Sequence, residues 1–317
     1  MSASTAIATT AIGKAPVSSA GRPAYVGRFA PSPTGALHLG SLVAALGSYL
    51  DARHHGGRWL LRMEDLDTPR VVPGCADTIL RTLESFGLTW DGDVVWQSRR
   101  TGLYQAAMAD LQSRGLTFEC SCPRRLRLEN EDRGYPGTCR DKPAPVAPAP
   151  GTTATRFRID DTTLTVEDRI QGRCELSLRS MGDVVIRRRD GIYAYQLAVV
   201  VDDADQGITD VVRGADLLSS TAWQVCMQRA LNVISPAYAH LPLIVEPDGT
   251  KLSKSRRSIA LDPARAPTLL LEALQLLGQR STPGLELEAP ESILRWAVEH
   301  WDPKSLHGIR SRSASQT

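Results

Sequence analysis

Hydrophobic and polar positions along the chain switch between strand-like and helix-like spacing. Residues 28–41 begin apolar, pass through a turn rich in proline and glycine, and continue into apolar side chains at helical spacing, at Leu39, Leu42, Val43, Leu46 and Leu50. A second apolar run at 57–63 precedes helical patterns at 73–87 and 99–115, each closed by glycine. This alternation of strands and helices predicts an α/β fold with a parallel sheet.

The alternation is interrupted once and then resumes. Residues 142–150 are proline-rich, which predicts an extended linker. Short strands are predicted beyond it at 155–159, 163–167 and 183–189, as a β-rich insertion. An apolar run at 196–201 restores the α/β pattern, and we expect strands at 207–212 and 240–245 and helices at 216–231, 268–277 and 291–301.

Composition limits the class of protein. The chain has 317 residues, 42% of them hydrophobic, and a formal net charge of +2. It is long enough for two domains, and its charge balance alone does not indicate a nucleic-acid binder. No apolar run approaches the roughly 18–20 residues of a membrane span, and residues 2–21 lack the pattern of a secretory signal. Since the cysteine pattern suits a reducing compartment, we expect a cytoplasmic protein with no membrane partner.

The start of the first predicted helix is a candidate phosphate site. His38 and Gly40 fall where free backbone N–H groups and the positive end of the helix dipole gather, which suits anionic phosphates. Gly40 allows a nucleotide to approach the backbone closely, and His38 offers a hydrogen bond. The alternative is a tight turn whose glycines serve backbone geometry alone.

Carboxylates follow the second predicted strand directly, at Glu64, Asp65 and Asp67. In open parallel sheets the carboxyl ends of the strands face the crevice where ligands bind. One carboxylate there suits the ammonium group of an amino acid. A solvated acidic turn is the alternative interpretation.

Cys120, Cys122 and Cys139 cluster in a stretch that has few apolar anchors. Three thiolates and one further donor suit a tetrahedral Zn²⁺, which would supply the missing cross-links. Ordinary free thiols are the alternative, and spacing does not determine a fourth ligand. We expect a structural metal, because the pattern implies no open catalytic position.

Basic side chains mark two further segments. Lys251 and Lys254 lie on a predicted loop, where flexible ammonium groups can follow phosphate charge as it redistributes. A loop of lysine and serine is by itself also typical of an exposed surface. The three arginines at 187–189 either contact phosphates or are simply solvated.

Two of these segments together resemble the signatures of class I aminoacyl-tRNA synthetases. Residues 31–41 resemble the HIGH signature in its glutamyl form, with Ser41 in place of the second histidine, and residues 251–255 resemble the KMSKS loop, with Leu252 in place of methionine. The resemblance implies a Rossmann-like parallel sheet in which His38 and Lys254 are catalytic. It also implies a site for ATP with Mg²⁺, formed by His38, Gly40, Ser41, Lys251 and Lys254.

Other positions resemble the glutamate-binding residues of glutamyl-tRNA synthetases. The resemblance implies that L-glutamate contacts Arg28, Phe29, Ala30, Pro31, Ser32, Glu64, Tyr195 and Arg213. The guanidinium groups of Arg28 and Arg213 suit the two carboxylates of glutamate, whereas glutamine would turn an amide NH₂ toward these donors. Glu64 suits the ammonium group, and Tyr195 offers a hydrogen bond.

The stretch after the lysine loop separates two groups within this family. Sixty-two residues follow Ser255, fewer than we expect for the anticodon-binding domain of an ordinary glutamyl-tRNA synthetase. The chain instead resembles the truncated paralogues, the glutamyl-queuosine tRNA(Asp) synthetases. The resemblance also implies that Tyr135 is the fourth ligand of one Zn²⁺ per chain, beside Cys120, Cys122 and Cys139.

This resemblance, together with the composition of the two ends, predicts the following division of the chain. We expect a disordered extension at 1–23, a Rossmann-like catalytic domain at 24–115 and 195–255, a zinc-containing α+β insertion on the acceptor side at 116–194, a short helical region at 256–303 and a disordered tail at 304–317.

The resemblance further implies a reaction in two steps. Glutamate is activated by ATP without tRNA, and the glutamyl group then passes to the queuosine base in the anticodon loop of tRNA(Asp); DNA has no part in the reaction. Two alternatives stay open: a short synthetase that charges the 3′ end of tRNA(Glu), and a non-catalytic paralogue that binds RNA. The presence of His38, Gly40 and Lys254 argues against the second. Sequence reasoning assigns no function to Asp202 and Asp203.

Overall fold

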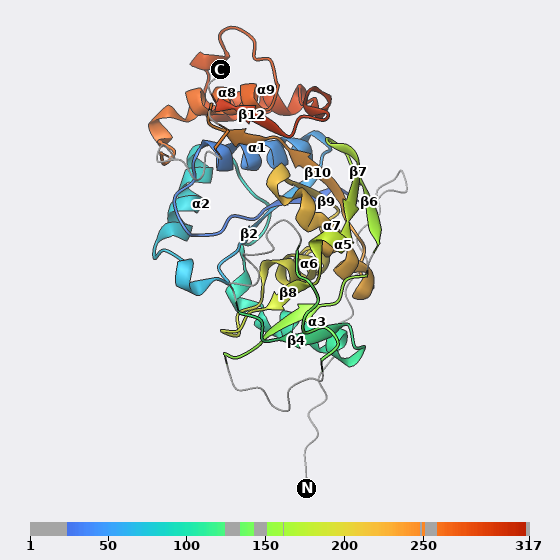
Figure 1. The fold of residues 1–317 in the computed structure, drawn as a ribbon. Helices are drawn as coiled ribbons and strands as arrows, with labels where there is room; N and C mark the ends of the chain where they lie inside the picture. The colour runs from blue at the N-terminus through green and yellow to red at the C-terminus, as the bar shows by residue number, and fades with distance from the viewer. Residues whose placement is uncertain are drawn as a thin grey trace.

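The N-terminal strand, turn and helix form as the apolar pattern predicts. The computed structural model describes residues 24–123, 134–142, 151–160, 162–247, 249–250 and 259–314. Three parallel strands and two helices make up the first part of the fold: β1 (Val26–Phe29), α1 (Leu39–His54), β2 (Arg58–Met63), α2 (Cys75–Ser85) and β3 (Val95–Trp96). A short 3₁₀ helix, η1 (Thr68–Arg70), lies between β2 and α2. The predicted parallel sheet is therefore confirmed (Figure 1).

A second sheet continues the α/β pattern and has the strand order β7-β6-β10-β9. β9 (Asp210–Gly214) and β10 (Ala237–Leu241) are parallel strands of this sheet. The helices before and between them are α6 (Tyr195–Asp205), η3 (Ala215–Leu217) and α7 (Leu218–Ala230). The backbone N–H of Thr209 donates to the carbonyl oxygen of Val26 at 3.0 Å. The start of β9 therefore lies beside β1.

An antiparallel hairpin, β6 (Thr163–Asp168) and β7 (Gly172–Ser177), forms one edge of the second sheet. β6 pairs in parallel with β10, where Asp168 lies opposite Tyr238. This hairpin belongs to the segment predicted as an insertion, and it extends the sheet that contains β9 and β10. The division of the chain into domains remains a prediction.

A third sheet lies at the far end of the molecule from α8 and α9 in Figure 1. It is antiparallel, with the order β4-β5-β8. Its strands and neighbouring helices are η2 (Gln97–Arg99), α3 (Thr101–Ser113), β4 (Thr117–Cys120), β5 (Ala154–Phe157), α5 (Leu178–Met181) and β8 (Val184–Arg187). The predicted short strands are confirmed, with ends that differ by a few residues.

The C-terminal helices pack on α1 at the top of Figure 1. They are α8 (Ala266–Leu276) and α9 (Pro290–Glu299), flanked by η5 (Pro263–Arg265) and η6 (Leu285–Leu287). Both helices were predicted from apolar spacing. Among the described residues, no helix combines the length and apolar composition that crossing a membrane requires.

Two expectations for the C-terminal half were wrong. The strand predicted at 240–245 is interrupted at Pro242, which has no backbone N–H, so β10 ends there and β11 (Leu243–Val245) follows. Described residues of the tail predicted as disordered are ordered: η7 (Pro303–Leu306) buries Leu306, and β12 (Ser311–Ser313) pairs in parallel with β11. A three-residue strand and one buried leucine leave too weak a hydrophobic signal in that polar segment for its order to be predicted from the sequence. Residues 1–23 and 315–317 lie outside the described ranges.

The core holds α1 against the second sheet. Leu42, Leu46 and Leu50 are almost fully buried, and each contributes about 1.5–3 kcal/mol by leaving water. Gly47 permits a close approach, because a Cβ at this position would lie 2.6 Å from Cδ1 of Leu241. Tight packing at Gly47 therefore fixes α1 relative to β10.

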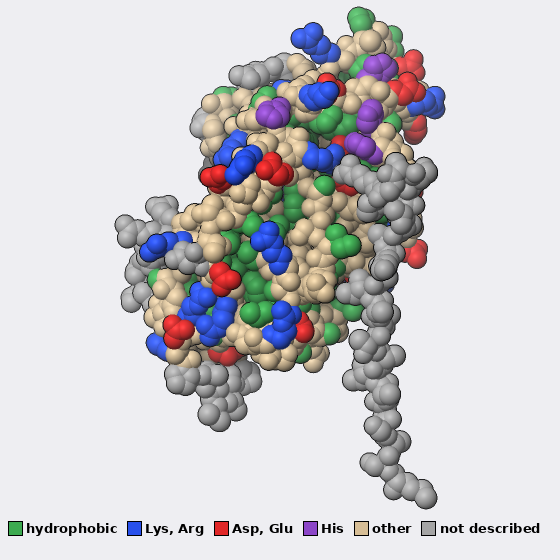
Figure 2. Space-filling model, turned by 90° about the vertical axis from the view of Figure 1, so that its right-hand side faces the viewer, with side chains coloured by type: hydrophobic (Ala, Val, Ile, Leu, Met, Phe, Trp, Pro, Cys, Tyr) green, Lys and Arg blue, Asp and Glu red, His purple; other side chains and the backbone are tan. Residues whose placement is uncertain are grey.

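One face of the molecule mixes basic and acidic side chains over its surface (Figure 2), in keeping with the net charge of +2.

Candidate active site and cysteine cluster

Arg28 on β1 is ion-paired with Asp203 on α6. Its Nε lies 3.2 Å from Oδ1 and its Nη2 lies 3.4 Å from Oδ2, and the residue is 4% exposed. Two such contacts fix the plane of the guanidinium group. Sequence reasoning assigned Arg28 to glutamate and missed Asp203, because no local spacing connects residues 175 positions apart.

Arg62 on β2 shares Asp203 with Arg28. Its Nη1 donates to Oδ1 of Asp203 at 2.7 Å and to Oε1 of Gln206 at 2.8 Å, and the side chain is fully buried. Burial alone would raise the pKa of Asp203, but Arg28 and Arg62 hold it below its usual value. Asp203 is therefore the shared counter-ion of two buried cations.

Asp202, the neighbour of Asp203, joins α6 to the segment that enters α3. This fully buried carboxylate accepts hydrogen bonds from Gln97 Nε2 at 2.7 Å, Arg100 Nε at 2.6 Å and Tyr104 Oη at 2.9 Å. The two adjacent aspartates thus have different roles. Asp202 fixes the helix, and Asp203 holds the arginines beneath the site.

Glu64 lies at the carboxyl end of β2, as the sequence predicted. Its backbone N–H donates to the carbonyl oxygen of Pro31 at 2.9 Å, which ties Glu64 to the turn between β1 and α1. Burial raises the pKa of Glu64 to about 7, against the opposing effect of Arg62 and Arg28. A cation bound beside Glu64 would favour its ionised form, so binding of a cation and loss of this proton are coupled.

Arg213 on β9 contacts Tyr195, the first residue of α6. The Nη1 of Arg213 donates to Tyr195 Oη at 3.2 Å, and its Nη2 donates to Thr221 Oγ1 at 2.7 Å. Burial raises the pKa of Tyr195, Arg213 opposes that shift, and Glu64 adds a smaller effect in the same direction as burial. The structure therefore brings together Arg213, Tyr195 and Glu64, which the sequence places far apart.

His240 on β10 completes this network. Its Nε2 lies 3.1 Å from Nε of Arg213, and its Nδ1 lies 2.6 Å from Oδ2 of Asp168. Burial lowers the pKa of His240, while Asp168 opposes that shift. Sequence reasoning missed both residues, since a single histidine ahead of an apolar strand gives no signal of its own.

His38 is the N-cap of α1. Its Nδ1 accepts a hydrogen bond from the backbone N–H of Ser41 at 3.4 Å, and Ser41 Oγ accepts one from the backbone N–H of His38 at 2.7 Å. This reciprocal cap fixes the first turn of the helix. The predicted helix start is confirmed. His38 and Ser41, which are both proposed ATP contacts, fix its geometry through this cap.

A cavity of about 190 Å³ opens beside this helix start. Its lining comes from α1, the end of β9, and β10 with β11: His38, Gly40, Ser41, Val43, Ala44, Gly214, Asp216, Leu241, Pro242, Leu243 and Ile244. A Cβ at position 40 would lie 3.1 Å from Cε1 of His38, so glycine keeps this wall open. The lining is apolar on one side and presents a helix start on the other, an arrangement that suits a nucleotide.

Other sequence-predicted site residues have different surroundings. Phe29 stacks on Trp59 with ring centroids 6.1 Å apart, so its side chain supports the core. In the turn between β1 and α1, Ala30 is half-buried, Pro31 is buried and Ser32 is exposed. Lys251 and Lys254 lie outside the described residues.

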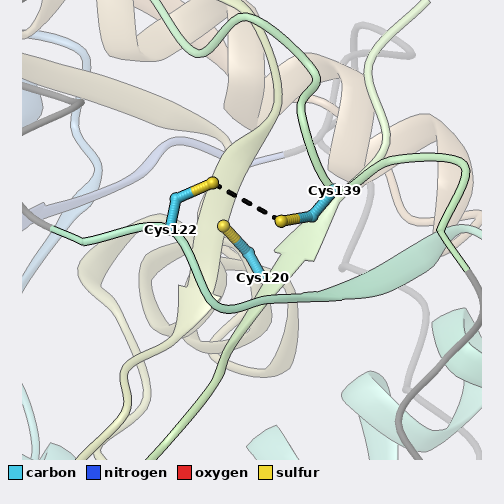
Figure 3. Close-up of side chains that lie close together, drawn as sticks. All are labelled: Cys120, Cys122 and Cys139. Atoms are coloured by element: carbon cyan, nitrogen blue, oxygen red, sulfur yellow. Dashed lines mark hydrogen bonds between the residues drawn. The ribbon is translucent and has the colours of Figure 1, made fainter.

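Three thiols face one another at the end of β4 (Figure 3). The sulfur atoms of Cys120, Cys122 and Cys139 all lie within 4.8 Å of one another. The Oη of Tyr135 is 3.5 Å from Cys120 Sγ and 3.7 Å from Cys122 Sγ, and it accepts the backbone N–H of Cys139 at 2.8 Å. Arg156 lies over the Tyr135 ring at 3.8 Å and holds its position. Three soft donors and a phenol gathered in this way fit a tetrahedral Zn²⁺.

The sheet, the helix-start cavity and the buried arginines agree with a match to one family. The family described as tRNA synthetases class I (E and Q), catalytic domain, matches residues 25–287. The chain belongs to this family.

Particular relatives narrow the comparison. The chain is 52% identical over 294 residues to a glutamyl-Q tRNA(Asp) synthetase of Ectopseudomonas mendocina, covering 92% of this chain and 98% of the relative. It is 52% identical over 283 residues to one of Pseudomonas entomophila, covering 89% and 94%. Among solved structures, a glutamate-tRNA synthetase from Elizabethkingia anophelis superposes with a TM-score of 0.75 at 26% identity, over 91% of this chain and 68% of that one.

Proposed function

We propose that this chain activates L-glutamate with ATP, without tRNA, and transfers the glutamyl group to queuosine in the anticodon loop of tRNA(Asp). The observation that carries this proposal is the 52% identity to a glutamyl-Q tRNA(Asp) synthetase over 98% of that relative's length. The geometry of the site supports the first step.

Glutamate recognition is assigned to the buried charges around Asp203. Asp203 engages Nε and Nη2 of Arg28, so Nη1 is the group that we assign to a substrate carboxylate. Arg213 and Tyr195 would hold the other carboxylate through charge-assisted hydrogen bonds. Glu64 would hold the ammonium group, whose charge favours the ionised carboxylate.

ATP is assigned to the cavity beside the start of α1. The base and ribose would lie against its apolar wall, and the phosphates would meet the helix start near His38 and Gly40. Mg²⁺ would come with the nucleotide and offset phosphate charge. Lys251 and Lys254 remain sequence predictions for the pyrophosphate.

Activation then needs positioning more than covalent help from the protein. A carboxylate oxygen of glutamate attacks the α-phosphorus, the bond from that phosphorus to the bridging oxygen breaks, and pyrophosphate leaves. In the second step a hydroxyl of the queuosine ring attacks the carbonyl carbon of the adenylate, and AMP leaves as the ester forms. The protein's contribution is to hold both reactants by fixed charges.

Zinc is assigned a structural role at Cys120, Cys122, Cys139 and Tyr135. These residues join the end of β4 to the described segment 134–142, in which side-chain packing is sparse. A metal there would stabilise the third sheet and the surface around it. A cluster of thiols of this kind also suits a reducing compartment, and we propose a cytoplasmic location.

Pyrophosphate exchange tests the activation step. Purified protein is incubated with ATP, labelled pyrophosphate and glutamate in the absence of tRNA, and we expect label in ATP that depends on glutamate and not on glutamine. His38→Ala should lower the exchange rate by about 10²-fold or more, whereas His307→Ala, a change at an exposed histidine, should leave it unchanged. Absence of exchange in folded wild-type protein would favour the non-catalytic alternative.

A further inference from the structure

His240 connects the hairpin β6–β7 to the arginine assigned to glutamate. Its imidazole lies between Asp168, at the end of β6, and Arg213, on β9, and it is fully buried. Thr221 Oγ1 also lies 3.2 Å from Nε2 of His240. The chain of contacts therefore runs from Asp168 on β6 to Arg213 on β9 through one histidine.

The surroundings of Asp168 determine where the imidazole proton lies. Its Oδ1 accepts the backbone N–H groups of Ile170 at 3.0 Å, Gln171 at 2.7 Å and His240 at 3.1 Å. Its Oδ2 faces Nδ1 of His240, and an ionised carboxylate only accepts hydrogen bonds, so Nδ1 carries a proton. Nε2 is then the acceptor for the Nε–H of Arg213.

The doubly protonated form of His240 would disrupt this arrangement. An N–H group at Nε2 would point at the N–H of Arg213, and two cations would share a buried site. Burial also lowers the pKa of His240, which agrees with a neutral ring.

We propose that His240 is a positioning residue, which accepts a hydrogen bond from Arg213 and thereby fixes the guanidinium group for a substrate carboxylate. The contact at Nε fixes the near end of the group, Thr221 fixes Nη2, and Nη1 is left beside Tyr195. Asp168 acts one step further away by holding the histidine tautomer. The proposal rests on the proposed function in one respect, that Arg213 binds glutamate.

Two substitutions of His240 separate its two contacts. His240→Gln can place an amide oxygen where Nε2 lies, which keeps an acceptor for Arg213. His240→Asn can place an amide NH₂ where Nδ1 lies, which keeps the contact with Asp168 and removes that acceptor. In the exchange assay we expect His240→Asn to raise the KM for glutamate about tenfold or more, with the KM for ATP unchanged and kcat less affected.

His240→Gln should recover most of this loss, to within about threefold of the wild-type KM. Asp183→Asn is the control: Asp183 is also buried and accepts hydrogen bonds from Arg140 and from the backbone of Ile159, yet it lies outside this network. It should lower the melting temperature without changing the KM for glutamate. If the two His240 variants behave alike, or if neither changes the KM for glutamate, the positioning role is wrong.

Nitrogen-15 NMR of the imidazole groups gives a test that does not depend on catalysis. The wild-type spectrum at neutral pH should contain a histidine protonated at Nδ1 and unprotonated at Nε2, and this signal should be missing from His240→Gln. A signal from His240 that is protonated at Nε2 would overturn the proposal even in an active enzyme. If the expected tautomer is present and the wild-type protein has no glutamate-dependent exchange, the arrangement of His240 stands, and the proposed function is what fails.

Discussion

Arg28 and Asp203 form a two-point ion pair beneath the site assigned to glutamate, with Nε 3.2 Å from Oδ1 and Nη2 3.4 Å from Oδ2. Arg62 contacts the same carboxylate, so one aspartate compensates two buried guanidinium groups. Such a cation remains buried only while its partner is present. Asp203 therefore contributes both to the stability of the fold and to the geometry of Arg28.

Replacing Asp203 should destabilise the protein. Asp203→Asn leaves two buried cations without their shared carboxylate, and we expect a loss of about 3–5 kcal/mol in the free energy of unfolding, measured by urea denaturation. Asp205→Asn is the control, because Asp205 is 43% exposed and its pairing with Arg100 is worth about 1 kcal/mol or less. Equal losses for the two variants would contradict the central position of Asp203.

Glu64 should give glutamate binding a pH dependence. The pKa of this carboxyl group is about 7 because of burial, so in the free enzyme it is mostly neutral below that pH and mostly anionic above it. The anion attracts the substrate ammonium group, so kcat/KM for glutamate should rise with pH, with an apparent pKa near 7. The measurement is pyrophosphate exchange at saturating ATP. Glu64→Gln should abolish this dependence, and a flat wild-type profile would contradict the assignment.

Gly40 should affect ATP more than glutamate. A Cβ there would lie 3.1 Å from Cε1 of His38 and would narrow the cavity beside α1. We expect Gly40→Ala to raise the KM for ATP about tenfold and to change the KM for glutamate by less than about twofold. Gly102→Ala is the matched control, since a Cβ in that helix meets no atom within 4 Å. An unchanged KM for ATP would place the nucleotide elsewhere.

Elemental analysis tests the cysteine cluster. Purified protein should contain about one zinc per chain if the site is tetrahedral and occupied. Cys122→Ser should lower that content, whereas Cys174→Ser, at a buried cysteine outside the cluster, should not. The cluster lies within residues 116–194, the insertion that we expect on the acceptor side. We therefore expect a chelator to impair transfer to tRNA more than pyrophosphate exchange. Zinc-free protein that is folded and fully active would contradict the assignment.

The parts of the fold that follow from local chemistry were predictable. The strand, turn and helix around His38 form because apolar spacing, a capping pair and a glycine-rich turn all favour the same structure. Short elements with few apolar positions were missed, among them β12, which becomes ordered through its pairing with β11. Pairing between distant strands depends on the tertiary fold and leaves little trace in a three-residue segment.

The candidate site divides in the same way. Arg28, Glu64, Tyr195 and Arg213 were predicted from motif resemblance, and the fold gathers them. Their partners were not predicted: Asp203 and His240 contact arginines that are distant in the sequence, and only the tertiary fold brings them together. No periodicity distinguishes a buried counter-ion from a solvated acidic pair before the fold is known.

The most direct test of the proposed function is transfer of labelled glutamate to purified tRNAs. The protein is incubated with ATP, labelled glutamate and, in separate reactions, tRNA(Asp) carrying queuosine, tRNA(Asp) lacking queuosine, and tRNA(Glu). We predict label on queuosine-containing tRNA(Asp) alone, held by an ester bond in the anticodon loop. Label on tRNA(Glu), or on tRNA(Asp) lacking queuosine, would contradict the proposed function.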